Sequence, residues 1–293
     1  MRTSRTLTVL SAACAAALSV SMLAGTTTTA NAAGPKWADA AKAKITPGVM
    51  MYTKGAQCTA NFVFTDRSGR VYVGYAAHCA GLGEATDTNG CEADSLPLGT
   101  RVRFSPDGNL ADGGTTVGRG RLAYTSWGTM HARGTKSANT CAYNDFALVR
   151  VSKADVKKVN PSVPVFGGPT GIDGDGTTEG DVVYSYGNSS LRGGAGPLQP
   201  KFGTSIGDEG KGWSHTVYTV SPGVPGDSGS GFMNADGKAL GTLSTLAIAP
   251  TPLSNGVGDL AKELAFAQKH SGIAGLKLAR GTEPFSPQVQ PPA

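Results

Sequence analysis

Residues 225–231 read Pro-Gly-Asp-Ser-Gly-Ser-Gly, and the interpretation of the whole chain starts from this stretch. Glycines on both sides of Ser228 let a substrate carbonyl approach the backbone closely. They also let the amides of Gly226 and Ser228 point together at a developing oxyanion. The alternatives are an ordinary glycine-rich loop and a G-x-S-x-G nucleophile elbow. The elbow is disfavoured because Ser230 stands where that motif needs glycine, so Ser228 becomes a candidate nucleophile.

Two earlier segments supply candidate partners for this serine. His78 lies in Ala-Ala-His-Cys at 76–79, after the apolar run 71–75, where a crosslink at the next residue would hold a general base rigidly. Asp145 opens the apolar segment 144–149, where an unpaired carboxylate would be costly to bury. A histidine partner removes that cost and fixes the imidazole tautomer. The alternatives are an isolated structural histidine and an aspartate that only caps a turn.

The composition predicts a mostly β protein. Glycine (42) and proline (17) are abundant and charged residues make up only 16%, which favours short strands joined by tight turns. Apolar or alternating runs predict strands at 61–65, 71–76, 116–124, 146–151, 182–186, 213–220 and 239–246. A 3.6-residue period near the end predicts one helix over 258–270. The length allows one large domain or two small ones.

The N-terminus has the pattern of a secretory signal peptide at 1–32. Arg2 and Arg5 precede the apolar stretch 7–25, and Ala30-Asn31-Ala32 supplies a cleavage site. We therefore expect a secreted, extracellular protein that starts at Ala33 and has no membrane contact after signal removal. The chain carries a formal charge of +5 but has no dense Lys or Arg cluster, so nucleic acid is an unexpected partner.

Four cysteines follow the signal region. An even number in an exported chain predicts two disulfides, for which three pairings are open. The zinc alternative lacks the usual spacings of Cys and His, so no metal site is expected. The acidic loop 173–181 is a candidate for calcium but does not fit an EF-hand, which favours a solvated loop. The cysteines are Cys58, Cys79, Cys91 and Cys141.

The three motifs A-A-H-C, D-F-A-L and G-D-S-G, in this order, together resemble the trypsin and chymotrypsin superfamily, especially its secreted bacterial branch. The resemblance spans about residues 48–270. It implies an all-β fold of two antiparallel six-stranded β-barrels, with the active site in the cleft between them and a C-terminal helix. The expected parts are an N-terminal segment at 33–46, a candidate propeptide; a first barrel at 47–155; a second barrel with the helix at 156–279; and a flexible Pro-rich tail at 280–293.

The resemblance also implies roles for the candidate residues. His78 is the general base, Asp145 orients it, and Ser228 is the nucleophile of an endopeptidase that acts on protein or peptide substrates through an acyl-enzyme. Gly226 and Ser228 donate to the oxyanion, and no cofactor is needed. We expect a monomer. The alternative is a catalytically silent binding protein on the same scaffold.

Two further expectations come from the resemblance. Cys58 pairs with Cys79, which leaves Cys91 with Cys141. The substrate pocket carries no charge, which favours a small or apolar P1 residue; its residues are Pro222, Gly223, Ser244, Thr245 and Leu246. Ile45 faintly resembles the start of an activated chain, whose new amine would pair with Asp227.

Overall fold

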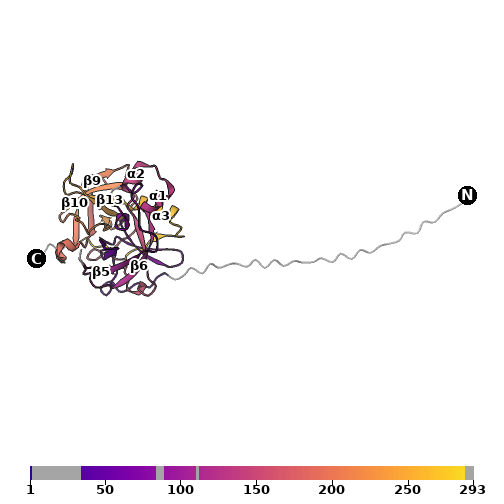
Figure 1. Cartoon of the computed structure of the whole chain (residues 1–293), viewed down its shortest axis with the longest axis horizontal. Helices are drawn as coiled ribbons and strands as arrows, with labels where there is room; N and C mark the ends of the chain where they lie inside the picture. The colour runs from indigo at the N-terminus through magenta and orange to yellow at the C-terminus, as the bar shows by residue number, and fades with distance from the viewer. Residues whose placement is uncertain (2–33, 84–88, 110–111, 288–293) are drawn as a thin grey trace. The chain divides into compact units, whose positions relative to one another are not determined.

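The computed structural model describes residues 1, 34–83, 89–109 and 112–287. Apart from Met1, the predicted signal peptide lies outside these residues, as does the end of the predicted tail at 288–293. The chain divides into two units, Met1–Asn31 and Ala32–Ala293, and the second contains all the elements discussed here (Figure 1).

No helix in the described ranges has both the length and the apolar content needed to cross a membrane.

The described residues form two antiparallel β-sheets with three α-helices and four short 3₁₀ helices. The first sheet contains β1 (Met50–Thr53), β2 (Ala56–Thr59), β3 (Val63–Thr65), β4 (Val71–Tyr75), β5 (Arg101–Ser105), β6 (Gly118–Thr125), β7 (Ala147–Val151) and β14 (Lys277–Leu278). The second contains β8 (Val182–Tyr186), β9 (Pro200–Glu209), β10 (Ser214–Thr219), β11 (Gly231–Asn234), β12 (Ala239–Leu246) and β13 (Asn255–Asp259). The helices are α1 (Ser126–Arg133), α2 (Ala138–Tyr143), α3 (Leu260–His270), η1 (Ala77–Ala80), η2 (Val156–Lys158), η3 (Ser190–Arg192) and η4 (Gly196–Leu198).

The second sheet is a closed six-stranded barrel in the order β10-β13-β12-β11-β8-β9. Closure leaves no edge strand exposed, and the inward side chains fill a small apolar core. The core residues are Val183, Val217, Phe232, Leu240, Leu243 and Val257. The expected all-β architecture is therefore confirmed, and the bounds of β8 and β12 are those predicted from the sequence.

The first sheet differs from the expected six-stranded barrel. It has eight strands in the order β14-β3-β4-β7-β6-β5-β1-β2. The additional edge strand, β14, comes from the C-terminal end of the chain and pairs Lys277 with Thr65. The inward residues of the first sheet form one apolar core. A second apolar cluster joins Phe64 and Phe146 to Met233 and Leu264 from the other half of the chain. The two halves are thus fixed against each other by shared packing.

Helix α3 was predicted two residues too early. It begins at Leu260 because Asp259 caps it: the Oδ1 atom of Asp259 accepts a hydrogen bond of 2.8 Å from the Lys262 amide. Helices α1 and α2 were not predicted. They are short, at eight and six residues, and their apolar residues are too few for a clear 3.6-residue period.

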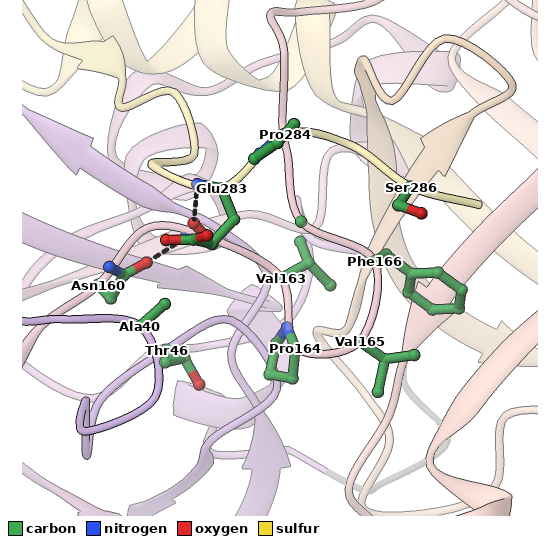
Figure 2. Close-up of a pocket in the computed structure, with 12 residues that line it drawn as sticks. Ala40, Thr46, Asn160, Val163, Pro164, Val165, Phe166, Glu283, Pro284 and Ser286 are labelled. Carbon is green, nitrogen blue, oxygen red and sulfur yellow. Dashed lines mark hydrogen bonds between the residues drawn. The ribbon is translucent and has the colours of Figure 1, made fainter. Parts of the chain in front are cut away.

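The segments before and after the two sheets pack onto the body. Ile45 is fully buried and its amide donates to the Lys158 carbonyl. The predicted flexible tail at 280–293 is corrected over 281–286, where the amides of Gly168 and Ser286 bond across to Glu283 and Phe166. Figure 2 shows this segment passing beside residues 163–166, next to a cavity of about 390 Å³.

We predict that Gly74→Ala destabilises the protein by about 1–3 kcal/mol, because β4 has no room for a methyl group at this position. A Cβ atom on Gly74 would collide with the Asn61 side chain and lie 2.8 Å from the Phe64 ring. Gly171→Ala is the matched control, since a Cβ atom there meets nothing within 4 Å. Urea unfolding measures both variants. Equal midpoints for the two would show that β4 can shift to make room.

Candidate active site

His78 is held at the end of β4 by a short helix and a disulfide. Strand β4 runs straight into η1, which contains both His78 and Cys79. Cys79 bonds Cys58 of β2, 21 residues earlier in the sequence, and the other disulfide joins Cys91 to Cys141. These are the pairings that the resemblance implies. The crosslink restrains the backbone directly beside the imidazole.

Asp145 grips His78 at two points. Its Oδ2 atom lies 2.7 Å from Nδ1 of His78, and its Oδ1 accepts a hydrogen bond of 2.8 Å from the His78 amide. Ser244 donates a further bond of 2.6 Å to Oδ2. Burial opposes the charge on Asp145, but the histidine and these hydrogen bonds outweigh it, so the pKa of Asp145 lies below its usual value. Burial also opposes charge on His78, but Asp145 raises the His78 pKa above 6.5.

The turn containing Ser228 lies beside this pair. A Cβ atom on Gly229 would lie 2.8 Å from the amide of Ala76, two residues before His78. The Ser228 carbonyl accepts a bond of 2.8 Å from the Thr59 amide, and the Gly226 carbonyl accepts 2.8 Å from Thr59 Oγ1. Both bonds tie the turn to the first sheet. Gly226 has a φ of +98°, which side chains rarely adopt.

Two backbone amides of the turn are free. Within the described part of the chain, neither the Gly226 nor the Ser228 N–H donates to a protein acceptor, although the Asp227 N–H between them bonds Val224. A bound oxyanion could therefore accept from both. The Ser228 hydroxyl is half-buried and makes no hydrogen bond with any described residue.

Asp227, next to Ser228, is a buried carboxylate with two cationic partners. Its Oδ2 lies 3.1 Å from Lys201 Nζ and 3.2 Å from Arg192 Nη2, and all three side chains are at most 12% exposed. Burial and the repulsion from Arg192 lower the Lys201 pKa, which Asp227 partly restores. In the uncleaved chain the Ile45 amide donates to the Lys158 carbonyl, and Asp227 is paired without a new N-terminal amine. Sequence reasoning missed Lys201 and Arg192, which no motif marks.

The same cations brace the loop that precedes the serine. Lys201 donates a bond of 3.2 Å to the Ser221 carbonyl, and Arg192 donates to the Pro222 carbonyl. Gly223 is clamped by Asn255, whose Oδ1 accepts from the Gly223 amide at 2.7 Å. The expected pocket residues Pro222 and Gly223 thus belong to a rigid loop with positive charge behind it.

The other expected pocket residues take different positions. Ser244 contacts Asp145, as described above, so its hydroxyl helps to hold the Asp145 carboxylate in place. The Thr245 carbonyl accepts a bond of 3.1 Å from Asn255, and Leu246 is 37% exposed. The sequence predicted Ser244 only as a residue of the substrate pocket, and its hydrogen bond to Asp145 was not predicted.

Glu263 is a buried carboxyl group that also contacts Asp145. Its Oε1 accepts a bond of 3.1 Å from the Asp145 amide, and its Oε2 accepts 2.8 Å from the Thr242 hydroxyl. Burial raises the Glu263 pKa well above 4.5, and the nearby Asp145 carboxylate raises it further, against the effect of the Thr242 bond. Burial therefore favours the neutral form of Glu263, which accepts from the Asp145 amide and so positions the Asp145 backbone.

Other candidate groups are used structurally. His215 is fully buried between Asp208 and Asp259, at 2.6 and 3.2 Å. In the acidic loop, the Asp173 carboxylate accepts bonds from Asn234 and from the Asp175 amide. The one group of possible metal ligands among the described residues, Cys58, His78 and Cys79, contains the two sulfurs of a disulfide.

We predict that Glu263→Gln makes stability less dependent on pH. Because the folded-state pKa of Glu263 is raised, the unmodified protein loses stability as pH rises above 4.5. The variant lacks this loss. Relative to the unmodified protein, its free energy of unfolding therefore rises by up to about 1.4 kcal/mol for each pH unit between 4.5 and the folded-state pKa of Glu263. Glu179→Gln, at an exposed carboxylate, is the control. Unfolding measured from pH 4 to 9 tests this, and parallel curves for the unmodified protein and Glu263→Gln would show an ordinary, ionised Glu263.

No protein-family model and no curated protein matches the chain. Solved structures of bacterial proteases are similar to it. Thermobifida fusca protease A is 15% identical, with 81% of this chain and 99% of that chain covered and a TM-score of 0.48. The Nocardiopsis protease is 17% identical (80% and 98% covered, TM-score 0.46), and Cellulomonas bogoriensis chymotrypsin is 15% identical (80% and 98%, TM-score 0.45). At these values the likeness concerns the fold, and any argument about activity has to rest on this chain's own residues.

Proposed function

We propose that the chain is a secreted serine endopeptidase with Ser228 as nucleophile, His78 as general base and Asp145 as its orienting partner. The observation that carries this proposal is the pair of contacts between the Asp145 carboxylate and His78, one with Nδ1 and one with the backbone amide. With the Nδ1 proton held by Asp145, the Nε2 atom of the neutral ring is left as an acceptor.

The proposed reaction follows from these atoms. Ser228 Oγ attacks the peptide carbonyl while its proton passes to His78 Nε2, and the resulting oxyanion accepts bonds from the Gly226 and Ser228 amides. The C–N bond then breaks as His78 returns the proton to the leaving amine, giving an acyl-enzyme and a free amine. Water attacks the acyl carbonyl while His78 Nε2 takes one of its protons. The bond from the carbonyl carbon to Ser228 Oγ then breaks as His78 returns that proton to Oγ, which releases the acid and restores Ser228. No cofactor enters this scheme.

Extracellular location is part of the proposal. Two disulfides suit an oxidising compartment, and the signal pattern at 1–32 supplies a route of export. The catalytically silent binding protein is the second candidate, because the Ser228 hydroxyl is not bonded to His78 in this structure. Reactivity of Ser228 separates the two.

We predict that a fluorophosphonate probe labels the folded protein on Ser228. Attack on phosphorus needs an activated hydroxyl and an oxyanion site, so Ser228→Ala should abolish labelling and His78→Ala should slow it by at least about a thousandfold. Ser230→Ala is the control, because the Ser230 hydroxyl is buried and bonded to the Asp227 carbonyl at 2.6 Å. Intact-mass analysis detects the adduct, and mass spectrometry of tryptic peptides locates it. An unlabelled folded protein supports the binding protein instead.

We predict that small or apolar P1 residues are preferred over Arg and Lys by at least about tenfold in kcat/KM. The loop at 222–223 offers no carboxylate, and a cationic side chain entering there would approach Arg192 and Lys201 from the far side of the loop. Matched peptides that differ only at P1 provide the comparison. An advantage for Arg or Lys at P1 would refute the pocket assignment. An advantage for Glu over Gln would instead indicate that Arg192 recognises a negative charge on the P1 side chain.

A further inference from the structure

Arginines from three strands stand in register on the outer face of the first sheet. Arg101 of β5 lies directly opposite Arg121 of β6, and Arg121 lies opposite Arg150 of β7. Arg103 is likewise opposite Arg119. The intervening residues of these strands are buried, so all five side chains project outward. We call this surface the arginine face.

This arrangement is unfavourable for the isolated fold. Like charges directly opposite each other on neighbouring strands repel and destabilise the sheet. The guanidinium groups of Arg101, Arg119 and Arg150 have no ion pair or side-chain hydrogen bond among the described residues. Arg121 bonds only the Gly99 carbonyl, and Arg103 lies 5.6 Å from the centre of the Tyr52 ring. Among the described residues no ion pair offsets the repulsion between these five arginines, although Asp155 attracts Arg119 at longer range.

Two hollows lie on either side of β6 in this surface. One, of about 360 Å³, is lined by Lys54 together with Arg101, Arg103 and Arg119. The other, of about 520 Å³, is lined by Arg121, Arg150, Arg70 and Lys153, with the hydroxyls of Ser68 and Ser152. Neither lining contains a carboxylate.

Carboxylates near the hollows already accept hydrogen bonds within the protein. Asp107, near Tyr52, accepts from the Ser105 hydroxyl and the Thr115 amide, and Asp112 accepts from the Gly114 amide. Asp66 is buried and bonded to Arg70 and to the Tyr72 hydroxyl. Asp155 accepts from the Lys158 side chain and from the Arg119 backbone amide. Of the eight cations around the hollows, only Arg70 forms an ion pair with another described residue. A net positive charge thus converges on two adjoining concave sites.

We propose that the arginine face binds a linear polyanion whose charged groups are tetrahedral oxyanions, phosphate or sulfate. The planar guanidinium donates two parallel hydrogen bonds to such groups, and each hollow offers several donors that three or four oxygens can use together. In a β-sheet the Cβ atoms of opposite residues on neighbouring strands lie about 5 Å apart, and residues two positions apart along one strand, such as Arg119 and Arg121, lie about 7 Å apart. Oxyanions repeated along a flexible chain can occupy both hollows at once, which provides avidity.

The surface fits this occupant better than two other anionic polymers. Single-stranded nucleic acid is normally held by bases stacked on exposed aromatic rings, but the one aromatic residue lining the hollows, Tyr52, is 4% exposed. An acidic polypeptide presents carboxylates with two oxygens each, which leaves donors in each hollow unused. The proposed site is separate from Ser228 and does not depend on peptidase activity.

Binding of long-chain inorganic polyphosphate and of dextran sulfate to the full mature chain, measured by calorimetry at several salt concentrations, tests the proposal. Arg101→Gln/Arg150→Gln should weaken binding of at least one of them by about tenfold or more and flatten its log–log salt slope by roughly 1.4–1.8. The two arms distinguish phosphate from sulfate. Hydrolysis of a short peptide or probe labelling should be unchanged, and the melting temperature should not fall, because two opposed pairs are removed.

The matched control removes the same charge elsewhere. Arg133→Gln/Arg280→Gln alters two exposed arginines outside both hollows and should change affinity by less than about twofold. Equal weakening by the control would overturn the site in favour of net charge alone. The proposal would also be overturned if neither polyphosphate nor dextran sulfate bound at physiological salt. Equally tight binding of poly-glutamate, or tighter binding of single-stranded DNA than of polyphosphate, would overturn it as well.

Discussion

The hydrogen-bonded carboxylate of Asp145 is the interaction on which the rest of the site depends. Three donors converge on it: two from His78, at the end of β4, and one from Ser244 of β12. Because β4 belongs to the first sheet and β12 to the barrel, one side chain joins the two halves at the candidate active site. Glu263 of α3 then fixes the backbone of Asp145 by accepting a hydrogen bond from its amide. Loss of the Ser244 or Glu263 contact would loosen the link between the halves, whereas loss of the His78 contacts would free the imidazole.

Charge burial follows two different solutions around the serine. Hydrogen bonds and His78 lower the pKa of Asp145 despite its burial, whereas burial raises the pKa of Glu263 and favours its neutral form. The buried Asp227 forms ion pairs with Lys201 and Arg192 from the same half of the chain. Folding alone therefore completes the Asp227 site, and no new chain end at residue 45 is required for it.

Local patterns in the sequence predicted some features well and others poorly. The three motifs predicted His78, Asp145 and the Ser228 turn because each lies in a distinctive local pattern. Glu263 had a detectable signal, since it shares one helix face with Leu260, Leu264 and Ala267, where a charged residue is out of place. Lys201 and Arg192 had none. The arginine face was also missed, because its residues are scattered over positions 101–150 and only strand register brings them together.

Strand β14 has a consequence for how the chain reaches this structure. The first sheet is built mainly from residues 50–151, but its edge next to β3 is covered only by residues 277–278, made more than a hundred residues later. During synthesis the N-terminal half therefore has an exposed edge strand, which is a site for wrong pairing with other chains. This edge can be covered only after residues 277–278 have been made, when β14 pairs with β3.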